Sequence, residues 1–119
     1  RRLRRHPVHA VVGERRAQLI QAKENVKRLE DNITAEISKA YRKLERTKLI
    51  VDAASEAVVL QKENQRLSAK QLEAGVIKKA QYAESVAAVK KAQWEELQAT
   101  LGYRLALAEL DRIAGRFNY

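Results

Sequence analysis

The chain has 119 residues, of which 33% are charged and only 5% are aromatic, with one Pro, four Gly and no Cys. Such a composition is typical of long helices that pack along narrow seams, and the lack of Cys excludes disulfides and thiolate metal sites. The formal net charge is +9 at pH 7, and no apolar run approaches the ~20 residues that a membrane-spanning helix needs.

The N-terminal residues 1–13 are basic and contain two residues that interrupt helices, Pro7 and Gly13. We therefore expect residues 1–13 to form an irregular basic lead-in. The chain contains no Met, so we expect Arg1 to mark a processed or excised piece of a longer protein. The arginines could neutralise phosphates, but no aromatic base-stacking set accompanies them, and we predict no nucleic-acid partner.

From Glu14 to Glu73 neither Pro nor Gly interrupts the chain, and we predict one helix over residues 14–73. Apolar residues recur there at spacings of three and four, as in the heptad pattern of a coiled coil. Glu56 and Glu63 are spaced for exposed ion pairs within the helix. The stripe comprises Leu19, Ala22, Val26, Leu29, Ile33, Ile37, Ala40, Leu44, Thr47, Val51, Ala54 and Val58.

A turn over residues 74–77 is predicted from Gly75, because glycine readily adopts the left-handed conformation that ends a helix. A second helix follows over residues 78–115, and Gly115 is expected to end it in the same way. Gly102, inside this helix, costs about 1 kcal/mol relative to Ala and is expected to let another helix approach closely. The second apolar stripe comprises Ala83, Ala87, Trp94, Leu97, Leu101, Leu105 and Ala108.

Folding the chain back at Gly75 gives an all-α fold, a long antiparallel helical hairpin (coiled coil). Counting equal distances from the turn places Ala114 beside about Glu36. The first helix then extends past the second by about 20 residues, or ~30 Å. Residues 14–35 keep their apolar stripe but have no partner in this chain, so the sequence predicts that helices from elsewhere cover them.

The chain lacks the residues of an enzyme active site. Its only histidines, His6 and His9, lie in the basic lead-in with no nearby carboxylate cluster, where they would bind a metal only weakly. No Ser-His-acid grouping, glycine-rich phosphate loop or paired carboxylates can be assembled from the remaining residues. We predict that the chain is not an enzyme and binds no cofactor and no metal.

The predicted turn presents two apolar side chains, Val76 and Ile77, at the end of a charged hairpin. If they are exposed, they suggest a docking point for another molecule; alternatively, they fold back onto the last helical turn. The aromatic residues are interpreted as packing contacts between neighbouring helices: Tyr41, Tyr82, Trp94 and Tyr103.

Three segments resemble the TolC-type outer-membrane efflux proteins. The turn region LSAKQLEAGVI (residues 67–77), followed by QYAES (81–85), is similar to the family's periplasmic tip. LGYRLALAELDRIAG (101–115) is similar to the end of its returning helix, and ISKAYRKL (37–44) to a stretch of its outgoing helix. The order and spacing of these segments agree with the family over residues 14–116. Leu72 departs from the family, which usually has Tyr there.

The resemblance implies a homotrimeric α-barrel that crosses the periplasm, joined to a β-barrel in the outer membrane. The chain would then be the hairpin of one repeat. The family's tip meets a periplasmic adaptor that links the channel to an inner-membrane pump, a role that falls on Ala74, Gly75, Val76 and Ile77. Its acidic pore constriction falls on Glu84, with Gln81 one turn earlier. Ile77 stands where some members carry a polar latch residue, which puts such latches in doubt.

Two other interpretations fit a helical hairpin. One is the α-hairpin of a periplasmic adaptor, although residues 108–115 are more similar to the channel family. The other is a free-standing coiled-coil scaffold or nucleic-acid-binding rod, which salt-dependent retention on DNA would favour.

Overall fold

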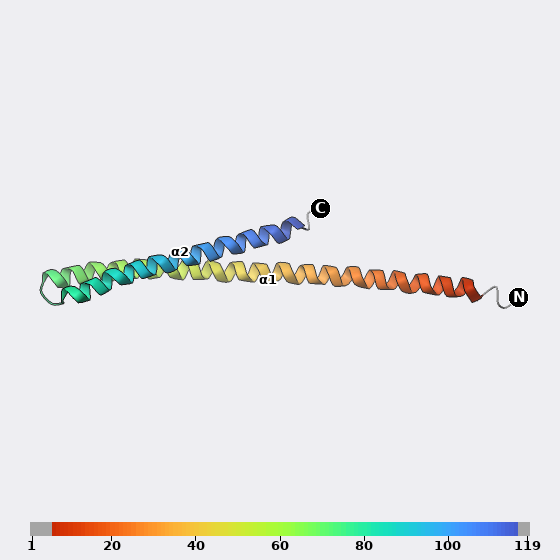
Figure 1. Ribbon diagram of the computed structural model, residues 1–119, viewed down its shortest axis with the longest axis horizontal. Helices are drawn as coiled ribbons and strands as arrows, with labels where there is room; N and C mark the ends of the chain where they lie inside the picture. Colours follow the sequence, from red (N-terminus) through yellow and green to blue (C-terminus); the bar gives the residue numbers. More distant parts are fainter. Residues whose placement is uncertain (1–5, 117–119) are drawn as a thin grey trace. The chain divides into compact units, whose positions relative to one another are not determined.

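The computed structural model describes residues 6–116, which form two helices, α1 (His6–Glu73) and α2 (Lys79–Arg116), and contain no strand. The chain divides into two units, residues 1–38 and residues 39–119. In the second unit, α2 runs back antiparallel to the C-terminal part of α1 (Figure 1). The predicted all-α helical hairpin is therefore confirmed. Near its C-terminus, α2 continues through Gly115 by one residue, so Gly115 does not end it as predicted.

The expected irregular lead-in is wrong over residues 6–13, because α1 already begins at His6. Pro7 lies in the first turn, where backbone N–H groups have no acceptor within the helix and none is lost. Gly13 weakens a helix by about 1 kcal/mol but does not interrupt it. Residues 1–5 lie outside the described part of the chain.

The two helices of the second unit meet along a regular heptad seam. Every a and d position of this seam is buried or half-buried, and the α1 stripe predicted over residues 40–58 is confirmed. On α1 the seam comprises Ala40, Leu44, Thr47, Val51, Ala54, Val58, Gln61, Gln65, Ser68 and Leu72. On α2 it comprises Tyr82, Ser85, Val89, Ala92, Glu96, Ala99, Tyr103, Ala106, Leu110 and Ile113.

Small side chains occupy most d positions of the seam, which allows the helix backbones to approach closely. On α2 these positions hold Ser or Ala until Ile113, and both Ala106 and Ile113 are only 2% exposed. An exposed ion pair shows the register of the two helices: Lys43 Nζ lies 3.2 Å from Glu109 Oε2. Counting from Gly75 alone places residue 107 opposite Lys43, a difference of two positions that arises because the turn extends to Lys78.

The apolar stripe predicted on α2 is not the side that faces α1. All seven residues of the predicted stripe are exposed. The residues of α2 that form the seam lie on another face of the helix. Four of them, Ala87, Trp94, Leu101 and Ala108, occupy the f position of the heptad, as does Ala80 one heptad earlier. This position is opposite the seam and is normally polar. α2 therefore has two apolar faces, and only one is covered within the hairpin.

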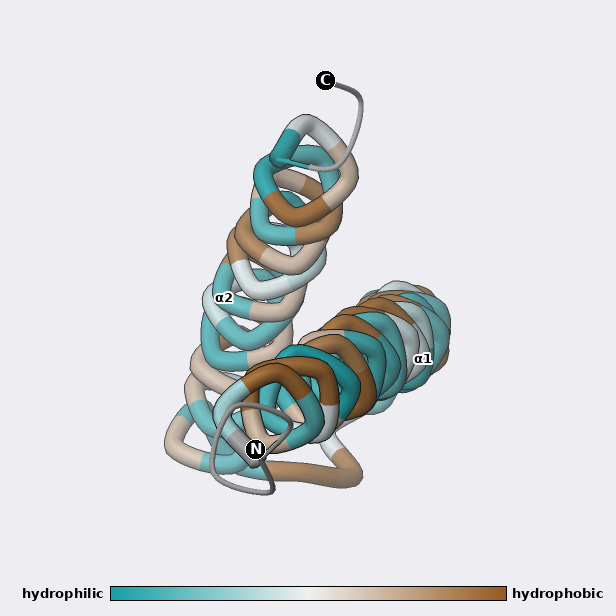
Figure 2. The backbone as a smooth tube through the Cα atoms, turned by 90° about the vertical axis from the view of Figure 1, so that its right-hand side faces the viewer, coloured by the Kyte–Doolittle hydropathy of each residue, from teal (hydrophilic) through white to brown (hydrophobic). Residues whose placement is uncertain are grey.

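The first unit carries its apolar residues uncovered. Every described side chain from Pro7 to Asn32 is exposed, and hydrophobic residues recur between hydrophilic ones along both helices (Figure 2). The large exposed members in this part of α1 are Val8, Val11, Val12, Leu19, Ile20, Val26 and Leu29. The part of the predicted apolar stripe that lies within residues 14–32 is therefore exposed.

Candidate docking tip

The turn between α1 and α2 is a complete Schellman motif. Gly75 has a φ of +73°, its N–H donates to the carbonyl of Leu72 at 3.0 Å, and the N–H of Val76 donates to the carbonyl of Gln71 at 2.9 Å. These are the two hydrogen bonds that define this C-cap, with Gly75 at C′ and Val76 at C″. The turn predicted at residues 74–77 is confirmed, with Lys78 added.

The N-terminus of α2 is capped by the side chain of Gln81, which lies in the first turn of the same helix. Gln81 Oε1 accepts a hydrogen bond from the backbone N–H of Lys78 at 3.0 Å, and the N–H of Gln81 donates to the carbonyl of Lys78 at 3.0 Å. A Gln at the third helical position that reaches back to the N-cap forms one half of a capping box. The residues of the tip are thus held from both helix ends.

Val76 is the most exposed apolar side chain of the tip, at 72%, whereas Ile77 is half-buried. In many Schellman motifs an apolar residue at C3 covers the side chain at C″. Here C3 is Gln71, an exposed polar residue, which offers Val76 no apolar partner. Of the two expected arrangements, Val76 follows the exposed one and Ile77 folds back.

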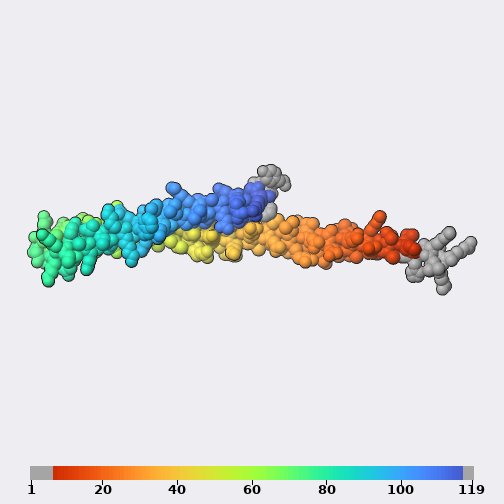
Figure 3. Space-filling view, viewed as in Figure 1, coloured from red at the N-terminus to blue at the C-terminus, as the bar shows by residue number. Residues whose placement is uncertain are grey.

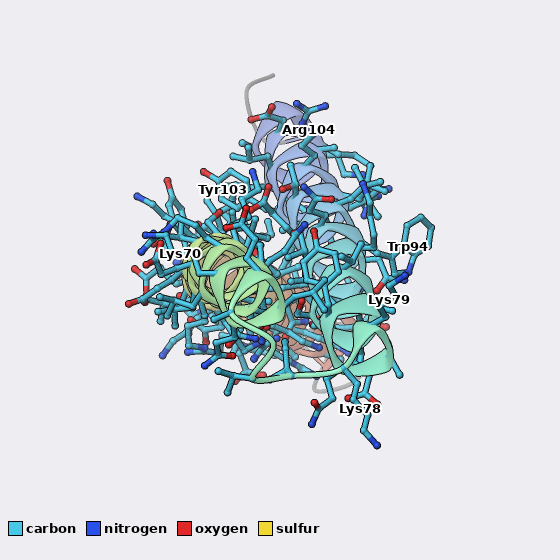
Figure 4. The ribbon with its side chains drawn as sticks, turned by 90° about the vertical axis from the view of Figure 1, so that its left-hand side faces the viewer. Lys70, Lys78, Lys79, Trp94, Tyr103 and Arg104 are labelled. Carbon is cyan, nitrogen blue, oxygen red and sulfur yellow. The ribbon has the colours of Figure 1, made fainter. Side chains whose placement is uncertain are left out.

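Lysine side chains surround this apolar point. Lys70 extends from the end of α1, and Lys78 and Lys79 extend from the start of α2, in different directions around the tip (Figure 4). All three are exposed, and Glu73 is the acidic residue among them. The tip therefore combines an apolar side chain with an excess of positive charge, a feature that the sequence analysis did not single out although it follows from the residue types.

The two predicted constriction residues lie on the first turns of α2. Gln81 and Glu84 are both exposed, and Gln81 has the additional structural role of capping the helix. Directly after Glu84, the buried Ser85 donates its hydroxyl hydrogen bond to the carbonyl of Tyr82 at 2.6 Å. Glu84 is thus an exposed side chain of the second helical turn, and its spacing of three from Gln81 places both residues on neighbouring positions of the helix surface.

Comparison of the chain with protein-family models, with curated proteins and with solved structures gives no match. Neither α1 nor α2, over the residues described, is long and apolar enough to cross a membrane. In residues 6–116 no three His, Cys, Asp or Glu side chains lie close enough together to hold a metal ion. The tip and the exposed helix faces are therefore the features from which a function can be argued.

Replacing Gly75 by Ala is expected to destabilise the hairpin by about 1 kcal/mol, because a side chain strains the left-handed backbone. No atom lies within 4 Å of the position of an added Cβ, so this cost is conformational and not steric. The free energy of unfolding, from urea titration followed by circular dichroism, measures it.

Gly102→Ala is the matched control for this substitution. No atom lies within 4 Å of a Cβ at Gly102, so no helix of this chain requires the glycine. Ala in place of a helical Gly should stabilise by up to about 1 kcal/mol. Equal effects of the two substitutions would show that the positive φ of Gly75 is not needed.

Proposed function

We propose that this hairpin is the periplasmic coiled-coil portion of an outer-membrane efflux or secretion channel, and that its tip docks a periplasmic adaptor protein. The observation that carries the proposal is the uncovered Val76 on a turn fixed by caps at both helix ends. A rigid turn that presents an apolar side chain is suited to insertion into a partner, because little conformational entropy is lost on binding.

The exposed apolar faces of both helices support the same proposal. A hairpin that is complete by itself would carry polar residues opposite its seam, whereas α2 carries Trp94 and Leu101 there, both exposed. Such helices are suited to a wall in which each hairpin has neighbours. The resemblance of the tip and of the returning helix to the TolC-type family adds the identity of that wall, a homotrimeric tube continuing into the outer membrane.

In the proposed mechanism the channel is a passive conduit, and an inner-membrane pump supplies the energy through the adaptor. Hairpins move relative to one another at the tip end and thereby widen the entrance. Glu84 faces the lumen, where several copies form a ring of carboxylates that favours cations and contributes to gating. Gln81 lies one turn closer to the entrance.

The proposed docking surface also defines the chemistry of its partner. Val76 requires an apolar depression, and the lysines around it favour acidic residues at the rim of that depression. Because these charges are exposed, their contribution is screened by salt, whereas the apolar contact is not. The lysines therefore set the rate and orientation of docking more than its strength.

Photocrosslinking from the tip tests this proposal. A photoreactive residue in place of Ala74, in the full-length protein in its native cells, is expected to crosslink to a periplasmic adaptor identified by mass spectrometry. Val76→Asp should reduce that crosslink about tenfold or more, since a charge in an apolar depression costs at least the 1.4 kcal/mol that a tenfold change represents.

Gln93→Asp provides the control, because it introduces the same charge at an exposed position of α2 outside the tip. It should leave the crosslink unchanged. Crosslinks from the tip to an outer-membrane channel would favour the adaptor hairpin instead, and an absence of any partner other than the chain itself would contradict docking at Val76.

A further inference from the structure

The face of α2 opposite the seam is apolar and basic between residues 89 and 107. Its apolar side chains are Trp94, Leu97, Leu101 and Leu105, which are between 51% and 71% exposed. Trp94 is directed away from α1 (Figure 4). Three exposed basic residues, Lys90, Lys91 and Arg104, flank them, and no acidic residue occupies a b, c or f position of this segment. We call this surface the α2 edge.

The corresponding face of α1 is apolar and acidic between residues 45 and 63. Leu49, Val59 and Leu60 are its large apolar side chains, each at least 64% exposed. Its b, c and f positions also hold four carboxylates, Glu45, Asp52, Glu56 and Glu63, against the single base Arg46. We call this surface the α1 edge.

Glu63 of the α1 edge forms an ion pair within its own helix. The Glu63 carboxylate accepts hydrogen bonds from Arg66, including one of 2.9 Å from Nε, and this contact lowers the pKa of Glu63 below its usual value. All four acidic residues are exposed. Counted over the b, c and f positions of these two ranges, the formal net charge at pH 7 is −3 on the α1 edge and +3 on the α2 edge. Arg66, just beyond the α1 edge, pairs with Glu63 and offsets one negative charge of that edge.

The two edges lie at the same height along the hairpin. Lys43 opposes Glu109, so counting along both helices toward the turn places Val51 opposite Leu101 and Val58 opposite Trp94. Leu49 of the α1 edge is thus within two residues of the height of Leu101, and Arg104 lies at a height between Glu45 and Asp52. By the same counting Trp94 lies within one residue of the height of Val59, and Lys91 lies within two residues of the height of Glu63, whereas Leu97 and Leu101 lie closest in height to Glu56 and Asp52.

We propose that the chain associates with a second copy of itself, side by side and in the same direction, with the α2 edge of one copy against the α1 edge of the next. In copies related in this way, each residue lies at the same distance along the hairpin axis as the same residue of the neighbouring copy. The heights compared above between the two edges of one chain therefore also apply between neighbouring copies. The contact is heterologous, so each hairpin keeps one free edge and can add further copies until a ring closes. Figure 3 shows α2 lying along the C-terminal part of α1.

This contact specifies how the wall of the proposed channel would form, and in that respect it rests on the proposed function. It is nevertheless measured separately, because self-association in solution requires neither an adaptor nor transport. Failure of docking with intact self-association would reject only the proposed function. Failure of self-association with intact crosslinking at the tip would reject only the contact between edges.

Sedimentation velocity of the 119-residue chain tests the proposal together with the fluorescence of Trp94, the only Trp. Rising concentration is expected to give larger species and a blue shift of the emission, as the indole leaves water. Leu101→Glu on the α2 edge and Leu49→Lys on the α1 edge should each reduce the association constant about tenfold or more, because each adds a charge that repels the facing edge.

Mixing the two variants distinguishes a heterologous contact from a symmetric one. L101E retains an intact α1 edge and L49K an intact α2 edge, so the mixture should associate through these two intact edges more tightly than either variant alone. If L49K alone associates as tightly as the unaltered chain, the contact joins two α2 edges and the proposal fails. If L101E alone does so, the contact joins two α1 edges and the proposal fails equally.

Gln93→Glu is the control for charge, since it places a carboxylate on an exposed position of α2 outside the edge, and it should associate like the unaltered chain. The double variant L49K/L101E places opposite charges at matched heights and should recover part of the lost affinity. A chain that remains monomeric at every concentration, with an unchanged Trp94 emission, would overturn the proposal.

Discussion

Replacing Ala106 by Asp is expected to lower the free energy of unfolding of the hairpin by roughly 3–5 kcal/mol, because it leaves an unpaired charge in the seam. Ala106 is 2% exposed and occupies a d position where the backbone of α1 lies close. Burial there removes the carboxylate from water, which disfavours its charged form. Urea unfolding followed by circular dichroism measures the effect.

Ala108→Asp provides the matched comparison, since the same substitution two residues away falls on the exposed outer face of α2. Its cost should stay below about 1 kcal/mol, the difference in helix propensity between Ala and Asp. Similar losses at both positions would show that the seam is not where the structure places it. A larger loss at Ala108 would assign the outer face of α2 to the contact with α1.

The break at Gly75 and the α1 stripe could be predicted from the sequence because both depend on local properties. Gly75 is the only glycine between two long uninterrupted segments, and only glycine adopts a positive φ without strain. The α1 stripe from Ala40 to Val58 has no competing apolar face of equal regularity. The helix start at His6 does not follow from residue type, because Pro and Gly usually interrupt helices; Pro7 is tolerated in the first turn, and Gly13 only weakens the helix.

The face that α2 turns toward α1 could not be predicted, because the helix has two apolar stripes. The outer stripe contains Trp94 and three Leu, so hydrophobicity alone favours it, whereas the seam contains Ser85, Glu96 and several Ala. Small residues are selected where backbones approach closely, and a large side chain is excluded there. Hydrophobic periodicity identifies a stripe but does not identify its partner.

The tip could be predicted as a turn with apolar residues, but not the division between Val76 and Ile77. That division depends on the backbone direction after Gly75 and on the polar Gln71 at C3, which leaves Val76 uncovered. The role of Gln81 in the helix cap also required the structure. The convergence of Glu84 with other copies depends on an assembly and remains a prediction from the resemblance.

Ile113→Ala should lower the free energy of unfolding by about 2–4 kcal/mol, as for a fully buried side chain replaced by Ala. Ile113 is the large d residue near the open end of the hairpin, and it is 2% exposed. Most other d positions hold small residues, so a considerable part of the apolar area in this half of the seam comes from this side chain. Its loss should also free the last turns of α2, which hydrogen exchange would detect as reduced protection of residues 106–116.

Leu105→Ala is the control, because a side chain of the same size lies eight residues earlier on the same helix and is 71% exposed. In dilute solution, where single hairpins predominate, its effect should be within about 0.5 kcal/mol. At concentrations that drive association of the edges, the free energy of unfolding becomes coupled to assembly. Leu105→Ala should then lower the free energy of unfolding. The loss caused by Ile113→Ala should stay at least as large as in dilute solution. Leu105→Ala could instead lower the free energy of unfolding as much as Ile113→Ala at every protein concentration. That result would contradict the position of the seam. It would also contradict the assignment of Leu105 to an edge that only a second copy covers.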